Sequence, residues 1–292
     1  MISENLDLLG LLDLEPIEVN LFRGYSPPTR LKRVFGGQVI AQAMVAACRT
    51  VEGRLPHSLH AYFILGGDPT APIIYEVGRL RDGRSFTTRR VTAIQHGHAI
   101  FSMIVSFHNA EEGFEHQSPM PDVPMPEDID LEKMLAQLKP DEMPPALRYF
   151  LRTNGAVEMR PVSLDRYVGK TLSDASFPIW MRSKVTMPDD PVMHQIVLAY
   201  ASDFALLDIG LARHGASLFT PDISAASLDH AIWFHRPFRA DEWLLYCQDS
   251  PNANGGRALT RGAFYRRDGT MVASVAQEGL IRRSRPKETA KS

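Results

Sequence analysis

The sequence predicts an α+β protein made of two similar units in tandem. One long hairpin in each half of the chain supports this prediction. Residues 84–107 contain two runs of strand-forming residues around Gly97, and residues 257–281 contain two more around Gly269. Long β-prone runs on either side of a short glycine-containing turn are typical of β-hairpins.

The spacing between the halves indicates a duplicated unit. Gly97 and Gly269 are 172 residues apart, and the strands that begin at Ser58 and Ser227 are 169 residues apart. Nearly constant offsets of this kind are the signature of an internal repeat.

Each unit also has an amphipathic segment ahead of its strands. Residues 36–51 and residues 192–211 both show the helical period, and Pro-Asp-Asp-Pro before the second segment is a helix start signal. A long helix followed by antiparallel strands is best buried when the sheet wraps around the helix. The sequence therefore predicts the hotdog arrangement twice, that is, a double hotdog.

A proline-rich acidic stretch divides the two units. Seven prolines lie between residues 118 and 145, around a single short helical run at 129–138. This composition is typical of a linker that crosses the surface. We expect an N-terminal hotdog at 1–117, a linker at 118–150 and a C-terminal hotdog at 151–292.

Composition and motifs exclude several classes of function. The net charge of −2 gives no sign of nucleic acid binding, and no apolar run approaches the length of a membrane span. The two cysteines fit no metal or redox spacing, and the chain has no nucleophile elbow, zinc motif or dinucleotide motif. We expect no metal and no cofactor, and we interpret Asp229-His230 as a hydrogen-bonded pair on a strand.

Asp203 is an unusual residue in its predicted setting. By helical spacing it shares an apolar face with Ile196, Ala199, Tyr200, Leu206 and Leu207, and no Lys or Arg occurs from residue 185 to residue 212. A carboxylate in apolar surroundings is costly unless it is hydrogen-bonded. It could cap a loop or bond a buried backbone group, or it could have a chemical role.

Two more polar residues of the second unit lie on apolar faces. Gln277 ends a row formed by Met271, Ala273 and Val275, and Ser227 begins a strand. An edge position and a strand entry would explain them separately. If they meet Asp203, however, a carboxylate, an amide and a hydroxyl could hold one water molecule, with Asp203 as its base. Burial without a cation would raise the pKa of Asp203 toward useful basicity.

The chain resembles the acyl-CoA thioesterase II family from about residue 12 to residue 283. The resemblance is carried by many stretches in the same order: LFRGYS (21–26), RVFGGQVIAQA (33–43), PHSLHAYFILGGD (56–68), PIIYEVGRLRDGRSFTTRRVTAIQHG (72–97), GFEHQ (113–117), YASDF (200–204), LDHAIWFHRPFRADEWLLY (228–246) and VASVAQEG (272–279). It implies a double hotdog that hydrolyses fatty acyl-CoA to free fatty acid and CoA, without metal or cofactor.

The resemblance also implies which residues act on the substrate. The family's catalytic Asp, Thr and Gln fall on Asp203, Ser227 and Gln277. Serine departs from the family threonine but keeps the hydroxyl, so we expect activity to survive. A backbone N–H near a helix start is the expected oxyanion donor. His57 and Gln38 are candidate substrate-binding residues, although a strand histidine bonded to a backbone carbonyl is the more common explanation for a residue such as His57.

Two other functions stay open at the sequence level. A hotdog hydratase or dehydratase acting on acyl-CoA typically pairs a His with its acidic residue, and no His lies one or two turns from Asp203. A non-catalytic acyl-CoA-binding protein is the second alternative, which the serine at position 227 favours. From the resemblance we also expect a homodimer or higher oligomer. The chain ends in Thr-Ala-Lys-Ser instead of the peroxisomal Ser-Lys-Leu, which favours a cytoplasmic location.

Overall fold

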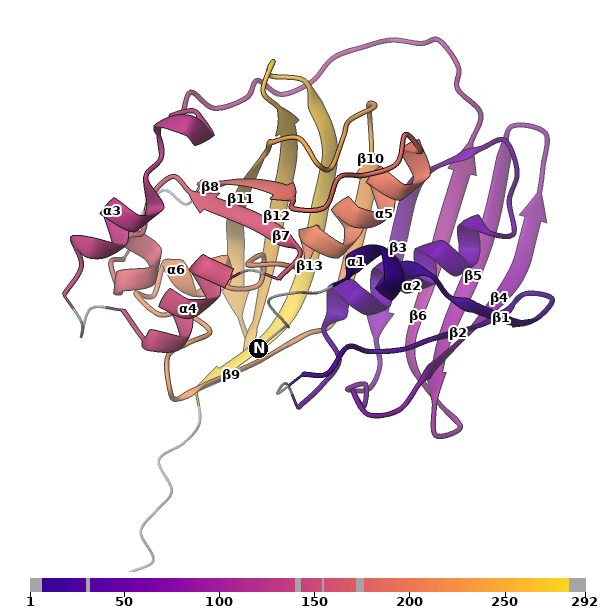
Figure 1. Cartoon of the computed structure of the whole chain (residues 1–292), viewed down its shortest axis with the longest axis horizontal. Coiled ribbons are helices and arrows are strands. Elements are labelled where there is room, and N and C mark those ends of the chain that lie inside the picture. The colour runs from indigo at the N-terminus through magenta and orange to yellow at the C-terminus, as the bar shows by residue number, and fades with distance from the viewer. Residues whose placement is uncertain (1–6, 30–31, 140–142, 154, 172–175, 284–292) are drawn as a thin grey trace, which may run out of the picture.

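The computed structural model describes residues 7–29, 32–139, 143–153, 155–171 and 176–283. The C-terminal residues 284–292, on which the location argument depends, are outside this description. Within the described residues the strands form one antiparallel sheet of 13 strands, and the helices lie against it (Figure 1).

The first unit contributes six strands. They are β1 (Glu15–Glu18), β2 (Leu21–Gly24), β3 (Leu55–Phe63), β4 (Ile73–Asp82), β5 (Phe86–Gln95) and β6 (His98–His108). The second unit contributes β7 (Val157–Pro161), β8 (Phe177–Ser183), β9 (Ile223–Ser227), β10 (Asp229–Phe234), β11 (Leu244–Asn254), β12 (Arg257–Arg266) and β13 (Met271–Arg283). The predicted hairpins β5–β6 and β12–β13 are both confirmed. Gly97 and Gly269 supply the positive φ angles, 78° and 86°, that their turns require.

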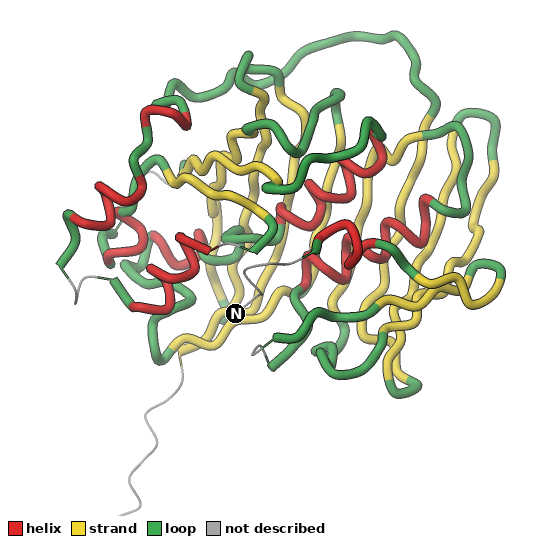
Figure 2. The backbone as a smooth tube through the Cα atoms, viewed as in Figure 1, coloured by secondary structure: helices red, strands yellow, loops and turns green. Residues whose placement is uncertain are grey.

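In the described parts of the chain six α-helices and two short 3₁₀ helices accompany the sheet; Figure 2 shows where the helices lie against the strands. They are α1 (Leu8–Leu12), α2 (Gly36–Cys48), α3 (Leu131–Ala136), α4 (Pro145–Thr153), α5 (Pro191–Ser202), α6 (Ile209–Ala212), η1 (Pro126–Asp128) and η2 (Asp165–Val168). The long helices α2 and α5 are the ones that the two amphipathic segments predicted. They lie side by side against the same face of the sheet (Figure 1).

The two units share one sheet because β3 pairs with β10. The strand order is β1-β2-β4-β5-β6-β3-β10-β13-β12-β11-β8-β7, and β9 adds to β13 beside this path. The Cα partners across the junction include His230 with Ala61 and Ile232 with Leu59. Segments of both units therefore meet in the middle of the sheet.

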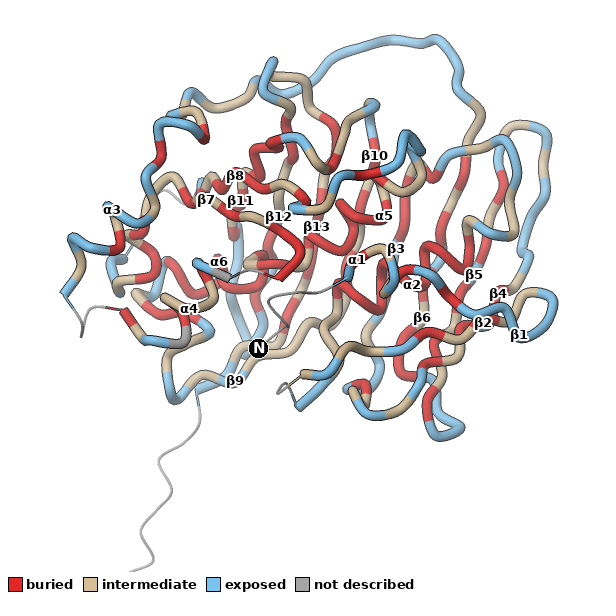
Figure 3. Tube along the Cα trace, in the orientation of Figure 1, coloured by how far each residue is buried: buried red, intermediate tan, exposed pale blue. Residues whose placement is uncertain are grey.

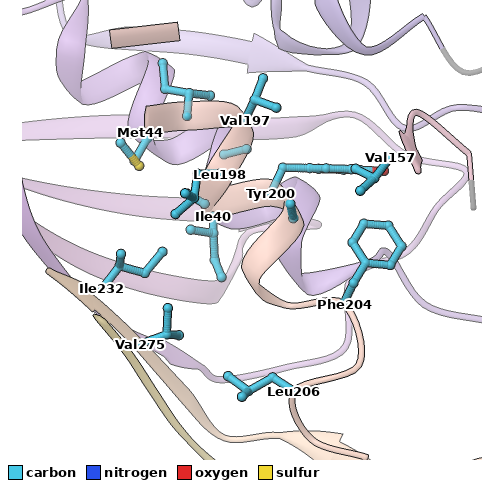
Figure 4. Close-up of a cluster of buried hydrophobic side chains, with 14 of the residues drawn as sticks. Ile40, Met44, Val157, Val197, Leu198, Tyr200, Phe204, Leu206, Ile232 and Val275 are labelled. Atoms are coloured by element: carbon cyan, nitrogen blue, oxygen red, sulfur yellow. The ribbon is translucent and has the colours of Figure 1, made fainter. Parts of the chain in front are cut away.

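The main core fills the space between the two helices and the centre of the sheet. Figure 4 shows Ile40 of α2, Leu198 of α5, Ile232 of β10 and Val275 of β13 in this cluster, and all four are buried. Burying each such side chain stabilises the fold by about 1.5–3 kcal/mol. The buried backbone in Figure 3 follows α2, α5 and the central strands, whereas the hairpin tips are exposed. The site described below lies on this rigid centre.

The proline-rich segment crosses the surface before it packs on the second unit. The chain arches from β6 to η1 along one side of the molecule (Figure 1). Leu135 of α3 and Leu147 of α4 are fully buried in the main core. The predicted linker therefore also supplies core side chains. The unit boundaries at 117/118 and 150/151 stay predictions.

Candidate active site

Asp203 lies at the end of α5, not in the middle of a helix as the sequence predicted. The helix begins after Asp190, whose carboxylate accepts the Val192 N–H at 2.9 Å, and it ends at Ser202. Asp203 is the C-cap residue. The expected single helix over residues 192–211 is wrong between Ser202 and Ile209, because Ala205 takes a φ of 62°, which a right-handed helix cannot contain; helix resumes at Ile209 as α6.

The first turn of α2 comes from the other unit and meets this carboxylate. The Gly37 N–H donates to Oδ2 of Asp203 at 2.9 Å, across 166 residues of sequence. The helix N-terminus also presents the positive end of its dipole to the carboxylate. Gly37 was not among the residues predicted from the sequence, and the adjacent glycines in RVFGGQ were the only sequence feature that indicated a close backbone approach here.

The close approach of α2 to α5 requires glycine at two positions. A Cβ at Gly37 would lie 2.4 Å from the carbonyl oxygen of Tyr200. A Cβ at Gly36 would lie 2.7 Å from Oδ2 of Asp203. Both distances are shorter than real Cβ contacts. At Gly37 the obstacle is backbone, so a larger residue would push the two helices apart, whereas at Gly36 it would displace the Asp203 carboxylate.

Gln277 connects Asp203 to Ser227. Its Nε2 donates to Oδ1 of Asp203 at 3.3 Å and to Oγ of Ser227 at 2.6 Å. Gln277 is fully buried on β13, and Ser227 ends β9, which pairs with β13 so that Ser227 faces Gly279. The structure therefore brings together the three polar residues that the sequence placed on separate elements.

The surroundings of Asp203 raise its pKa from the ordinary 3.8 to about 7. Burial is the main cause, since it penalises the charged form. The hydrogen bonds from Gly37 and Gln277 act in the opposite direction and lower the pKa. A carboxyl group with a pKa near neutrality is well matched to accepting a proton from water.

A cavity of about 280 Å³ adjoins this group. It is bounded by the first turn of α2, the end of β3 and the loop after it, the start of β6, and the end of β9 with Ser227. Its walls are mostly apolar and include Val39, Phe63, Ile64, Leu65, Ile100 and Ala225. Ser227 and Gly36 line the cavity, and Gly36 adjoins Asp203, so the carboxylate lies just behind this part of the wall.

Gln38 lies next to this group but points away from it. It is 4% exposed, and its Nε2 donates to Oγ of Ser26 at 2.9 Å and to the carbonyl of Tyr25 at 3.3 Å. These bonds hold the loop that precedes α2 against the helix. They give Gln38 a structural contact, and contact with substrate stays a prediction.

His57 is not brought to the group. Its Nε2 lies 2.8 Å from Oγ of Ser106, and its ring packs against Phe86 and His108. It lies near the start of β3, whereas Phe63, which adjoins Gly36, ends that strand roughly 20 Å away. His57 is therefore a hydrogen-bonded strand histidine, but its partner is a side-chain hydroxyl and not the expected backbone carbonyl. Substrate binding by His57 stays a prediction.

Two features are absent from the described residues. No group of three or more His, Cys, Asp or Glu side chains in this part of the chain is arranged to hold a metal ion. No helix that the structure describes is long and apolar enough to cross a membrane. A carboxyl group, an amide and a hydroxyl arranged as around Asp203 can hold and orient a water molecule.

The comparisons with known proteins match nearly the whole chain. The family described as "Acyl-CoA thioesterase N-terminal domain" matches residues 25–108, and the family described as "Acyl-CoA thioesterase" matches residues 150–280. Acyl-CoA thioesterase 2 of Haemophilus influenzae is 40% identical over 277 residues, which cover 94% of this chain and 97% of the relative.

Solved structures agree with the sequence comparison. The acyl-CoA thioesterase II TesB2 of Mycobacterium marinum is 43% identical with a TM-score of 0.78, and the match covers 95% of this chain and 98% of that chain. A protein of unknown function with a hot dog fold from Alicyclobacillus acidocaldarius is 20% identical with a TM-score of 0.73, covering 94% and 97% of the two chains. The predicted double hotdog is confirmed.

Proposed function

Because this chain belongs to the acyl-CoA thioesterase family and hydrolyses acyl-CoA thioesters, we propose that Asp203 is the general base of the reaction. Ser227 and Gln277 complete the site by orienting the attacking water. The observation that carries this proposal is the hydrogen-bonded group of Asp203, Gln277 and Ser227, of which Ser227 lines an apolar cavity.

The proposed reaction uses the Asp203 carboxylate to accept a proton and then to return it. The water oxygen attacks the thioester carbonyl carbon while Asp203 accepts the water proton. The tetrahedral oxyanion then collapses, the carbon–sulfur bond breaks, and the CoA sulfur leaves and takes the proton back from Asp203. The products are a free fatty acid and CoA, and the carboxylate is restored.

The first turn of α2 is suited to stabilise the oxyanion. The dipole at a helix start favours negative charge. The Gly37 N–H donates to Asp203 and the Gln38 N–H to the Phe35 carbonyl, so the Gly36 N–H is the group that we assign to the oxyanion. The N-terminus of α2 lies at Asp203, since Gly37 donates to that carboxylate. We assign the oxyanion donor to this turn, where preorganised N–H groups contribute about 10²–10³-fold to such reactions.

The apolar cavity is the site that we assign to the acyl chain. Its aliphatic and aromatic walls remove hydrocarbon from water, which contributes about 0.8 kcal/mol per buried CH₂ group. The polar thioester then lies at the one wall that carries Ser227 and Gly36. Assembly into an oligomer and a cytoplasmic location stay predictions from the resemblance.

The alternative functions fit the site less well. A hydratase would need a histidine in contact with Asp203, but the nearby His230 bonds Gln277 and burial lowers its pKa to about 4. The only feature that favoured a non-catalytic binding protein was the serine at position 227. Oγ of Ser227 accepts a hydrogen bond from Nε2 of Gln277 at 2.6 Å, so serine keeps the contact that the hydroxyl provides and this argument for a binding protein is weakened.

The test is release of free CoA thiol from butyryl-, octanoyl- and palmitoyl-CoA by the purified protein and its Asp203→Asn variant. Loss of a general base lowers the rate by about 10²–10⁴-fold. Asp249→Asn, which changes an exposed carboxylate paired with Arg261, is the matched control and should retain the rate. Equal activity of the wild type and Asp203→Asn would refute the assignment of the base.

A further inference from the structure

A buried chain of hydrogen bonds continues beyond Gln277 to side chains that the mechanism does not use. Nδ1 of His230 lies 3.1 Å from Oε1 of Gln277, and Nε2 of His230 lies 2.9 Å from Oγ of Ser202. His230 and Ser202 are both fully buried. The chain therefore runs from the last turn of α5, through β10, to the amide on β13 that bonds Asp203.

The proton positions along this chain are determined by the groups at its two ends. Burial lowers the pKa of His230 to about 4, so the ring is neutral near pH 7 and carries one N–H. The Gln277 carbonyl oxygen can only accept, so the ring proton is on Nδ1. Nε2 then accepts the Ser202 hydroxyl proton, which it shares with the Ala199 carbonyl oxygen at the same distance of 2.9 Å.

All donors in the chain consequently point toward the carboxylate. Ser202 donates to His230, His230 donates to the Gln277 carbonyl, and Gln277 donates to Asp203 and Ser227. The reverse orientation of the amide would place the Gln277 carbonyl oxygen against the Asp203 carboxylate, where two acceptors repel. In that orientation the ring proton would move to Nε2 and the Ser202 hydroxyl would donate to the Ala199 carbonyl alone, so the charge of Asp203 is what selects the orientation observed.

We propose that His230 is a positioning residue for thioester hydrolysis, which holds the Gln277 amide so that its N–H groups face Asp203 and Ser227. His230 touches neither Asp203 nor the cavity, so it acts only through Gln277. The inference rests on the proposed role of Asp203 as the base.

Loss of His230 would remove the buried hydrogen bond that holds the Gln277 carbonyl oxygen on the side away from Asp203. Without this hydrogen bond the Gln277 amide could rotate, and its Nε2–H would donate to Asp203 in only a fraction of the molecules. Asp203 would lose a hydrogen bond that stabilises its charged form, so its pKa would rise further. Other titratable groups nearby would not replace this effect. Tyr246, whose hydroxyl donates to the Ser202 carbonyl, stays neutral because burial raises its pKa well above 10, and Asp229 is turned to the Glu278 N–H.

The experiment compares pH–rate profiles for octanoyl-CoA hydrolysis. His230→Leu removes the donor at similar volume, and His230→Asn keeps an N–H close to the position of Nδ1. His235→Leu, which changes a histidine just beyond β10 that bonds Ser274, is the matched control. Each rate is divided by the folded fraction measured by circular dichroism.

For the wild type we expect the hydrolysis rate to fall at acidic pH with a midpoint near pH 7, where Asp203 becomes protonated. In His230→Leu the midpoint rises by about one unit, so that kcat falls about tenfold at acidic pH while KM is unchanged. His230→Asn should recover most of the shift, and His235→Leu should show none. If His230→Leu is too unstable to purify, Ser202→Ala tests the far end of the chain and should shift the midpoint less, in the same direction.

A merely structural role would lower the folded fraction and leave the midpoint unchanged. An unshifted profile in His230→Leu, or in Ser202→Ala where that variant has to be used, therefore overturns the inference, as does a His230→Asn variant no better than His230→Leu. Failure of the base assignment would be seen separately, as retained activity in Asp203→Asn.

Discussion

Substitution of Gly36 by alanine should impair catalysis with little effect on stability. The added Cβ would lie 2.7 Å from Oδ2 of Asp203 and 2.9 Å from Cζ of Phe63. Both contacts are to side-chain ends, which can move, and alanine is favoured over glycine in a helix by about 0.5–1 kcal/mol. The strain and the gain in helix propensity therefore partly cancel in the free energy of unfolding.

The cost to catalysis follows from the displacement of the base. Ordinary van der Waals contact begins at 3.4 Å, so the Asp203 oxygen must move by about 0.7 Å. A misplacement of about 1 Å in an active site can cost about 10²-fold. We therefore expect kcat to fall between about tenfold and 10²-fold, which corresponds to a barrier about 1.4–2.7 kcal/mol higher.

The assay is thiol release from octanoyl-CoA together with the Tm of each variant. Gly113→Ala is the control, because a Cβ at Gly113 meets no atom within 4 Å and should change neither quantity. Wild-type kcat in a folded Gly36→Ala variant would refute the idea that the first turn of α2 fixes the position of the Asp203 carboxylate.

Three further predictions concern pH, a buried ion pair and the cavity. Burial raises the pKa of Asp203 from 3.8 to about 7, so the folded chain holds this proton more tightly than the unfolded chain, and stability is lost as pH rises from about 4 through about 7. The Tm of Asp203→Asn should exceed the wild-type Tm above neutral pH and match it near pH 4. A Tm difference that does not change with pH would contradict this. Arg166 and Asp208 form a buried ion pair at 3.1 Å. Arg166→Met should lower the free energy of unfolding, measured in urea, by about 3–5 kcal/mol, and the double variant with Asp208→Asn should recover part of this loss. An unchanged unfolding midpoint in Arg166→Met would show that the pair does not stabilise the fold. Ala225→Phe should fill the cavity and shift the preference from palmitoyl- to butyryl-CoA, whereas an unchanged preference would place the acyl chain elsewhere.

Local patterns predicted the elements that carry the site. The helical period of residues 36–51 predicted α2, and the two glycine turns predicted both hairpins. The polar residues Asp203 and Gln277 were conspicuous because each interrupts an apolar row. These signals are local, since they depend on period, turn chemistry and the cost of burying a polar group.

The contacts between the units could not be predicted in the same way. Gly37 reaches Asp203 only because α2 packs closely on the end of α5, and this approach depends on the packing of both helices on the shared sheet. The early end of α5 was missed because residues 203–208 contain no Gly or Pro, and alanine at a positive φ gives no sequence signal. His230 was correctly interpreted as hydrogen-bonded, but its partner Gln277 is fixed by the pairing of β10 with β13.

The central claim is that Asp203 activates water and does not itself attack the thioester. The most direct measurement is a single turnover of octanoyl-CoA, with enzyme in excess, in water enriched in the heavy oxygen isotope. General-base catalysis by Asp203 predicts that the octanoate released carries the heavy isotope and that the peptide containing Asp203 does not. Unlabelled octanoate, together with the heavy isotope in the Asp203 carboxylate, would show a covalent intermediate and contradict the role of Asp203 as a base.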